Sequence, residues 1–88
     1  MDENQPAIVR ALRRVGASVY STAALGRGFP DLCVGWQGRN YLMEVKDGAK
    51  IRSKRRLTPE EEDFAAVWRG QLVVVETVDE ALAVIGVR

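Results

Sequence analysis

The sequence predicts one α/β domain in which a mixed β-sheet is flanked by helices, in the order α-β-β-β-α-β-α. Three observations predict it. Two strand-like segments are joined by a short connection containing Gly38, which is typical of a hairpin. Thr58-Pro59 followed by Glu61 is a strong helix start. A valine-rich apolar run then follows that helix, so a strand enters the sheet through a helical crossover and makes the sheet mixed.

The first half of the chain is expected to form one helix and three strands. Apolar residues recur at helical spacing from Pro6 to Val15, and Gly16 is the expected stop. A short strand, a glycine-bearing loop and the two strands of the hairpin should follow. Their expected ranges are Ala17–Thr22, Ala23–Pro30, Asp31–Trp36 and Tyr41–Lys46.

The second half begins with a polar, basic segment, Asp47–Arg56, which is expected to be irregular. Thr58 and Glu61 can form a capping box, and Thr77 offers a second one with Glu80. The remaining elements are expected to be a helix from Thr58 to near Gly70, a buried strand over Gln71–Val75, and a last helix from Thr77 through Ile85.

Composition places the chain among ordinary globular domains. Its 88 residues are enough for one domain, 1–88, and hydrophobic residues make up 47% against 28% charged. No apolar run approaches the ~20 residues of a membrane span. The first residues, MDENQP, do not have the pattern of a secretory signal. We therefore expect a cytoplasmic protein, in the bacterial host if a phage encodes it, with no membrane partner.

The chain has one cysteine, Cys33, and no histidine. An intramolecular disulfide is therefore excluded, and a structural zinc site nearly so. Acid–base or triad chemistry based on histidine is excluded as well. Any catalysis must use carboxylates, lysine, hydroxyl groups or a metal with oxygen ligands.

The formal net charge of +1 conceals an uneven distribution. Six cations lie between Lys46 and Arg56 against one acid, Asp47, and the acidic run Glu60–Asp63 follows directly. Local patches decide electrostatic recognition more than the total does, so nucleic acid is a compatible partner.

The expected hairpin gathers charged side chains on one face. A turn centred on Gly38-Arg39 gives paired residues that sum to 77, which places Asp31 opposite Lys46 and Cys33 opposite Glu44. Because side chains alternate along a strand and directly opposed residues share a face, Asp31, Glu44 and Lys46 converge there. A three-residue turn would change the parity and remove this arrangement.

Two carboxylates and an amine at strand ends suit phosphodiester chemistry. Two oxygen ligands suit Mg²⁺, which keeps waters and takes phosphate oxygens. Lys46 could orient a water or stabilise developing negative charge. The alternative from geometry alone is a surface ion pair between Asp31 and Lys46, with Glu44 a solvated strand residue.

Pro30-Asp31, followed thirteen positions on (44 − 31 = 13) by Glu44-Val45-Lys46, resembles the PD-(D/E)XK nuclease superfamily. The closer resemblance is to the VRR-NUC family, the virus-type replication-repair nucleases, and it covers almost the whole chain as in a small stand-alone phage-type member. Its supporting stretches are Gly28–Leu32, Tyr41–Lys46, and Leu57-Thr58-Pro59 with Trp68 downstream.

The resemblance implies a restriction-endonuclease-like fold and a Mg²⁺- or Mn²⁺-dependent DNA endonuclease. Asp31 and Glu44 would be metal ligands, the Val45 carbonyl a candidate third ligand, and Lys46 the catalytic lysine.

The resemblance leaves the roles of two further positions undecided. Family members often carry a glutamate near the metal on the first helix. This chain has the uncharged Gln5 there, with Glu3 close by, so a polar residue at the helix start is the alternative. Relatives tend to have Gln where this chain has Glu61, for which capping is favoured over an active-site role.

Stand-alone viral members are associated with homodimers that cut four-way (Holliday) junctions, so the resemblance implies branched DNA as substrate and a homodimer. Two alternatives stay open: a non-catalytic DNA-binding or accessory module that retained the fold, and a homodimeric structural protein. The candidate phosphate-binding cations are Arg27, Lys50, Arg52, Lys54, Arg55 and Arg56.

Overall fold

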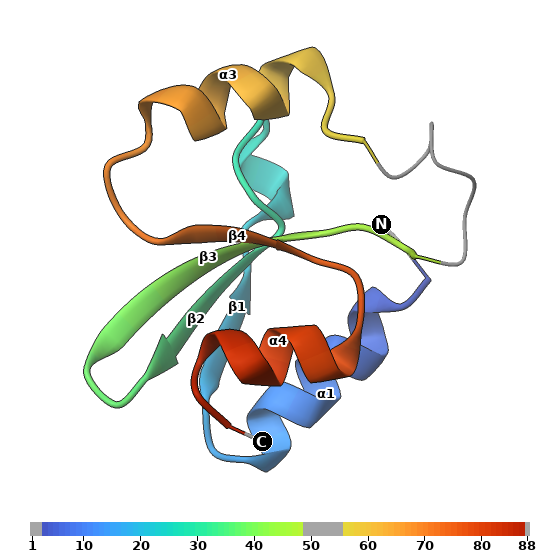
Figure 1. The fold of residues 1–88 in the computed structure, drawn as a ribbon, viewed down its shortest axis with the longest axis vertical. Coiled ribbons are helices and arrows are strands. Elements are labelled where there is room, and N and C mark those ends of the chain that lie inside the picture. The colour runs from blue at the N-terminus through green and yellow to red at the C-terminus, as the bar shows by residue number, and fades with distance from the viewer. Residues whose placement is uncertain (1–2, 49–55, 88) are drawn as a thin grey trace.

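The computed structural model describes residues 3–48 and 56–87, which form a four-stranded sheet between helices (Figure 1). The helices are α1 (Gln5–Arg14), α3 (Pro59–Val67) and α4 (Val78–Val84), with a 3₁₀ turn η1 (Ala23–Leu25) inside the expected loop. The strands are β1 (Ser18–Ser21), β2 (Leu32–Trp36), β3 (Arg39–Val45) and β4 (Leu72–Val75).

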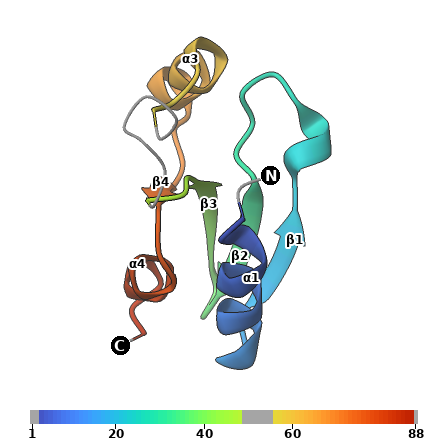
Figure 2. The same ribbon diagram turned by 90° about the vertical axis from the view of Figure 1, so that its right-hand side faces the viewer.

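The predicted α/β architecture with a mixed sheet is confirmed. The strands lie in the order β1-β2-β3-β4. The first three are antiparallel neighbours, and β4 pairs parallel to β3 after the crossover through α3. Helices α1 and α4 lie on one side of the sheet and α3 on the other, an arrangement compatible with a restriction-endonuclease-like fold (Figures 1 and 2).

The main core lies between the sheet and the α1–α4 pair. Ile8 and Leu12, one helical turn apart on α1, are fully buried, and they pack with Met43, Val45 and Val75 of the sheet. The spacing that predicted this helix is therefore the spacing of its buried face. Among the described helices, none has both the length and the apolar character that crossing a bilayer requires.

The hairpin register differs from the expected one by two residues. Trp36 pairs with Arg39 and Cys33 with Leu42, so paired residues sum to 75 and not to 77. The two-residue turn is Gln37-Gly38, and both residues have positive φ, 49° and 80°. This is the turn that matches the strand twist, and it requires positive φ at both central positions. Glycine occupies the second of them.

The two expected capping boxes have different outcomes. The box of Thr58 and Glu61 at the start of α3 is complete. At α4, the Thr77 hydroxyl accepts the Glu80 N–H at 3.0 Å, but the Glu80 carboxylate accepts the Glu76 N–H at 2.6 Å. The second box is therefore only half formed, because Glu80 reaches one residue further back than the motif requires.

Candidate functional site

Asp31 stands immediately before β2, and Glu44 is the second-last residue of β3. The pair Leu32 and Met43, extended by one residue, places Asp31 opposite Glu44. The expectation that Asp31 faces Lys46 is therefore wrong, and so is the pairing of Cys33 with Glu44, because the turn begins one residue earlier than assumed. The parity is unchanged, since both registers have odd sums. Asp31, Glu44 and Lys46 still share a face, and the carboxyl groups are closer than predicted.

A direct hydrogen bond fixes Asp31 against β3. Its Oδ2 accepts the Val45 N–H at 2.8 Å. The backbone of Asp31 and of the residue before it is held as well. The Thr22 hydroxyl donates to the Pro30 carbonyl at 2.6 Å, and the Thr22 N–H donates to the Asp31 carbonyl at 2.8 Å. Asp31 therefore has little freedom, which suits a group that must present its second oxygen to a ligand.

Lys46 is the centre of the ion pairs in the site. Its Nζ lies 2.9 Å from Glu61 Oε1 and 3.9 Å from Glu44 Oε2, and its side chain is mostly buried. Glu61 Oε1 also accepts the Thr58 N–H at 2.8 Å, while the Thr58 hydroxyl accepts the Glu61 N–H at 3.2 Å. The capping role of Glu61 is confirmed, and the same oxygen contacts Lys46; an active-site role for Glu61 stays a prediction.

Glu44 has a strongly raised pKa in this cluster. Burial is the largest cause that raises its pKa, from 4.5 to about 9. A hydrogen bond with Asp31 and the charges of Asp31 and Glu61 raise the pKa of Glu44 further, against a lowering by Lys46. Glu44 therefore keeps its proton near neutral pH. A bound divalent cation would displace that proton, because it relieves the repulsion between the carboxylates.

Glu61 behaves in the opposite way. Burial acts to raise its pKa, but the Thr58 backbone hydrogen bond and the Lys46 ammonium together lower the pKa of Glu61 below its ordinary value. Glu61 is therefore the ionised partner of Lys46, while Glu44 is the protonated one. The two glutamates differ because burial and the neighbouring Asp31 raise the pKa of Glu44, whereas the Thr58 backbone hydrogen bond and the Lys46 ammonium lower the pKa of Glu61.

The residues fit a hard cation with oxygen ligands. Within residues 3–48 and 56–87, no group of three or more His, Cys, Asp or Glu side chains has the arrangement of a ready-made metal site. Mg²⁺ does not need one, since one or two carboxylates with waters commonly hold it. Asp31 and Glu44 provide two carboxylates. The N–H of Val45 points to Asp31, and in an extended strand the carbonyl of the same residue points to that side too.

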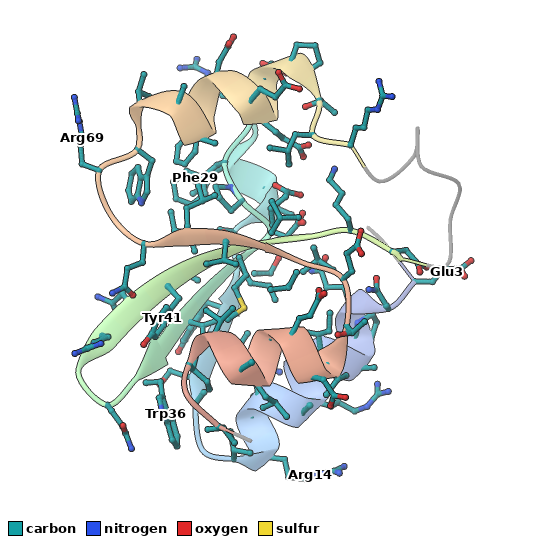
Figure 3. The ribbon with its side chains drawn as sticks, in the orientation of Figure 1. Glu3, Arg14, Phe29, Trp36, Tyr41 and Arg69 are labelled. Carbon is teal, nitrogen blue, oxygen red and sulfur yellow. The ribbon has the colours of Figure 1, made fainter. Side chains whose placement is uncertain are left out.

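The other predicted residues lie elsewhere or outside the described chain. Gln5 is buried at the start of α1, and no hydrogen bond joins it to Asp31 or Glu44 in the described part of the protein. Glu3 is exposed and points away from the sheet (Figure 3). Arg27 and Arg56 are also exposed. The remaining predicted cations, Lys50, Arg52, Lys54 and Arg55, lie outside the described residues.

Sequence reasoning missed how firmly two loop residues hold the site together. Asn4 Nδ2 donates to the Lys46 carbonyl at 3.0 Å and to the Glu76 carbonyl at 2.7 Å, tying the ends of β3 and β4 to α1. Gly28 has a φ of +79°, and a Cβ there would clash with the Glu60 carbonyl oxygen. Gly28 was visible as part of a motif, but its contact with α3 was not, because a sequence does not show close backbone approach.

An aromatic cluster supports α3 over the sheet. Phe64 stacks on Trp68 with ring centroids 5.1 Å apart, and Phe29 meets the Phe64 ring edge-on at 5.0 Å. Phe29 lies beneath α3 and belongs to the loop that leads to Asp31 (Figure 3). The cluster therefore couples the position of α3, and with it Glu61, to the segment that places Asp31.

Comparison of the chain with protein-family models, with curated proteins and with solved structures finds no significant match. The resemblance to VRR-NUC nucleases therefore rests on the motif and on the residues around it.

Proposed function

We propose that this chain is a divalent-metal-dependent endonuclease that hydrolyses phosphodiester bonds in DNA. One observation carries the proposal: Asp31 lies opposite the buried Glu44 and is fixed by the Val45 N–H, and the Lys46 Nζ lies 3.9 Å from Glu44 Oε2. A structural ion pair of Lys46 with Glu61 has no need for two further carboxyl groups beside it. A site that binds a cation does, and the raised pKa of Glu44 agrees with it.

The roles of the residues follow from their chemistry. Asp31 and Glu44, with the Val45 carbonyl, would hold Mg²⁺ or Mn²⁺, which supplies positive charge at a phosphoryl oxygen when bound. Lys46 would orient the attacking water or stabilise charge that develops on the phosphoryl oxygens. Water oxygen bonds to phosphorus, the bond from phosphorus to one ester oxygen breaks, and the leaving oxygen takes up a proton.

Cleavage assays with purified protein test this proposal. Duplex, single-stranded, flap and four-way DNA are incubated with Mg²⁺, with Mn²⁺ or with EDTA. We expect cleavage with metal and none in EDTA. Asp31→Asn, Glu44→Gln and Lys46→Ala should each abolish cleavage and leave the circular dichroism spectrum unchanged. Asp79→Asn is the matched control, because Asp79 is an exposed acid on α4, across the sheet from the site.

A metal-binding measurement separates the ligands from the lysine. Calorimetry with Mn²⁺ should detect a site in wild type and in Lys46→Ala. Binding should be lost in Asp31→Asn and in Glu44→Gln. Equal Mn²⁺ binding in all four proteins would place the metal elsewhere and contradict the assignment.

The ion pair of Lys46 with Glu61, 2.9 Å long, favours a second candidate. In a non-catalytic DNA-binding module that retained the fold, this pair would be purely structural. Such a module would bind DNA without cleaving it under any metal condition, and Glu44→Gln would leave DNA affinity unchanged.

We propose further that the substrate is branched DNA, including four-way junctions, and that the protein acts as a homodimer in the cytoplasm. A two-fold symmetric junction requires two cuts, and a symmetric dimer provides two identical sites. The cations between Lys46 and Arg56 would hold phosphates next to the metal. Each phosphate contact contributes about 0.9 to the slope of log K against log salt.

Light scattering and gel-shift assays test this part. We expect a dimer that prefers a junction to matched linear DNA. Replacing Arg52, Lys54, Arg55 and Arg56 by Ala should flatten the salt slope and weaken binding to all sequences alike, whereas Arg14→Ala should not. A monomer that binds both DNAs equally, with the same salt slope in the loop variant, would contradict the dimer and leave only the local chemistry.

A further inference from the structure

The sheet face that carries the candidate site is open to solvent over β1. α3 lies at the β4 end of the sheet, and β1 forms the opposite end (Figure 2). Val19 of β1 is buried in the core with α1, so the alternating side chains of Ser18 and Tyr20 lie on the other face, which is the face of Asp31. Both are exposed, and Tyr20 is 74% exposed. The face of the site therefore continues onto β1 with an accessible aromatic ring.

The strand register places Tyr20 next to the candidate site. Tyr20 pairs with Cys33, and Asp31 precedes Cys33 by two residues on the same strand side. The Thr22 N–H donates to the Asp31 carbonyl, which extends the same register as far as Asp31. Tyr20 and Asp31 are therefore diagonal neighbours on one face, roughly 7–8 Å apart at Cα. A long aromatic side chain at that distance can contact a nucleotide whose phosphate lies at Asp31.

A hollow of about 420 Å³ lies further along β1 and β2, at the hairpin end of the sheet. Its lining includes Gly35, which pairs with Ser18 on one side and with Asn40 on the other. A Cβ on Gly35 would lie 3.6 Å from Asn40 Oδ1 and 3.6 Å from the Ser18 Cβ, so these two side chains flank the space that the glycine leaves. Arg39 is exposed and lines the hollow as well. The hollow therefore offers an amide, a hydroxyl and a cation around an accessible strand backbone.

The spacing of this open surface suits an unstacked strand of nucleic acid. Successive residues on one face of a strand are about 7 Å apart, whereas the stacked bases of a DNA strand are about 3.4 Å apart. Nucleotides that follow the rows of the sheet are therefore unstacked, as they are in a single strand. The surface has no negative charge to repel phosphates, and Arg39 at its end attracts them. Its residues are Ser18, Tyr20, Cys33, Gly35 and Asn40.

We propose that this open surface binds an unpaired, single-stranded segment of the DNA substrate as that segment leaves the site. Tyr20 stacks on the base next to the phosphate at Asp31. The following nucleotide lies in the hollow, where the Asn40 amide hydrogen-bonds to its base and Arg39 pairs with a phosphate. Aromatic stacking accepts any base, so the surface selects unpaired structure and not sequence. The inference rests on DNA being the substrate, and it assigns the preference for branched DNA to nucleotides that are unpaired at the branch.

The test measures binding in EDTA, so that no metal-dependent cleavage takes place. A short labelled strand of thymidines is titrated with protein, and fluorescence anisotropy is the readout. A second strand of the same length has an abasic sugar at every position, which keeps the phosphates and removes the bases. The variants are Tyr20→Leu, Tyr20→Phe and Gly35→Val. Val67→Ala is the control, because Val67 is 69% exposed but lies on α3, at the other end of the sheet.

We expect wild type to bind the thymidine strand about tenfold more tightly than the abasic strand, as stacking on one aromatic ring would give. Tyr20→Leu should lose most of this preference, and Tyr20→Phe should keep it, because the ring stacks without its hydroxyl. Gly35→Val should weaken binding of the thymidine strand several-fold by filling the hollow. Its melting temperature should not fall, since valine suits a strand and the added Cβ meets its neighbours at ordinary contact distances. Val67→Ala should bind both strands as wild type does.

Equal binding of the two strands by wild type would overturn the proposal, because charge attraction alone would then account for binding. Wild-type affinity and preference in Tyr20→Leu would overturn it too. If Tyr20→Leu or Gly35→Val turned a dimer into a monomer with unchanged DNA affinity, the surface would be an interface between two copies of the chain, and the proposal would be wrong.

The result is independent of cleavage. Metal-dependent cleavage by a protein that does not distinguish the two strands removes the single-strand surface and leaves the nuclease. A preference for the thymidine strand in a protein that cleaves under no metal condition keeps the surface and removes the nuclease.

Discussion

The two faces of the sheet are packed in different ways, although the same strands supply both. Towards α1 and α4, Met43 and Val45 of β3 are completely or almost completely buried against apolar neighbours. Towards α3, the intervening residue Glu44 is just as buried, but its neighbours are Asp31, Lys46 and Glu61. Alternation along one strand therefore places the apolar core on one face and the charged cluster of the candidate site on the other.

The helices on the two faces of the sheet also differ in how deeply they are buried. Ile8 and Leu12 of α1 are fully buried, whereas α3 has no buried residue, and Val67 is 69% exposed. Instead, α3 is held by the Phe29–Phe64–Trp68 cluster, by the close approach of Gly28 and by the ion pair of Glu61 with Lys46. Few contacts hold this helix, and one of them belongs to the candidate site, so α3 should be displaced before the rest of the fold unfolds.

The largest expected effect on stability tests the packed face directly. Leu12→Ala should lower the free energy of unfolding by about 2–5 kcal/mol, because it leaves a cavity in the main core. Phe64→Ala, its counterpart on α3, should cost about 1–2 kcal/mol, since its ring is only half-buried. Urea denaturation of both variants measures the difference. Equal losses would show that α3 is as firmly packed as α1.

The second prediction concerns Glu44 in the candidate site, whose replacement should stabilise the protein at high pH where Leu12→Ala destabilises it. Because the pKa of Glu44 is about 9 in the fold and 4.5 is its ordinary value, the folded state binds more protons than the unfolded state across that window. The stability this gives is fully present below pH 4.5 and is lost as pH rises towards 9, by at most about 1.4 kcal/mol per pH unit.

Melting temperatures in EDTA between pH 5 and 8 check this effect. Wild type should melt progressively lower as pH rises, and Glu44→Gln should lose most of that decline and melt higher than wild type at pH 8. Asp79→Asn serves as the control, since it removes an exposed carboxylate on the other face. Added Mn²⁺ should stabilise wild type at pH 8 and leave Glu44→Gln unchanged. A wild-type melting temperature that rises with pH would contradict the buried, protonated state of Glu44.

Most of the fold was predictable because it depends on local signals. Apolar spacing predicted α1, the Thr-Pro cap predicted α3, and a valine run predicted β4. The parity of the hairpin was predictable too, and parity alone decides which side chains share a face. The exact register was not, because Gln37-Gly38 and Gly38-Arg39 both place glycine in a two-residue turn, and only backbone twist distinguishes them.

The candidate site was predictable in its residues but not in its connections. Asp31, Glu44 and Lys46 were visible as a motif, whereas the contact of Glu61 with Lys46 spans fifteen residues (61 − 46 = 15) and depends on where α3 lies over the sheet. That position depends in turn on the backbone contact at Gly28 and on three aromatic rings. Contacts of this kind depend on how α3 packs against the sheet, which composition and residue spacing do not reveal.

Two glycine-to-alanine substitutions separate the effect of the contact with α3 from the effect of backbone strain, and both should be smaller than the effects above. Gly28→Ala places a methyl group against the Glu60 carbonyl oxygen and also strains a positive φ. Gly38→Ala strains a nearly equal φ, +80°, but its methyl group meets nothing within 4 Å. Strain alone costs about 1–2 kcal/mol. Gly28→Ala should cost more than Gly38→Ala by melting, and it should lower cleavage much further. Equal cleavage rates in the two variants would show that α3 does not support the site.

The smallest expected effect concerns Glu61, whose single oxygen accepts from both Thr58 and Lys46. Glu61→Gln keeps an oxygen for the cap, since glutamine also completes a capping box, but it removes the charge that holds Lys46. Both side chains are mostly buried, but the glutamine oxygen can still accept a hydrogen bond from the Lys46 ammonium, so the loss should be about 1 kcal/mol.

Cleavage by Glu61→Gln should stay within about threefold of wild type, because Lys46 keeps its charge and its place beside Glu44. Glu61→Ala removes both the cap and the lysine contact, so it should melt lower by several degrees and cleave more slowly than Glu61→Gln. The expected order of cleavage rates is therefore wild type, then Glu61→Gln, then Glu61→Ala, with Asp31→Asn far below all three. If Glu61→Gln were as inactive as Asp31→Asn, Glu61 would act in the chemistry, and the division between a reactive strand pair and a supporting helix would have to be abandoned.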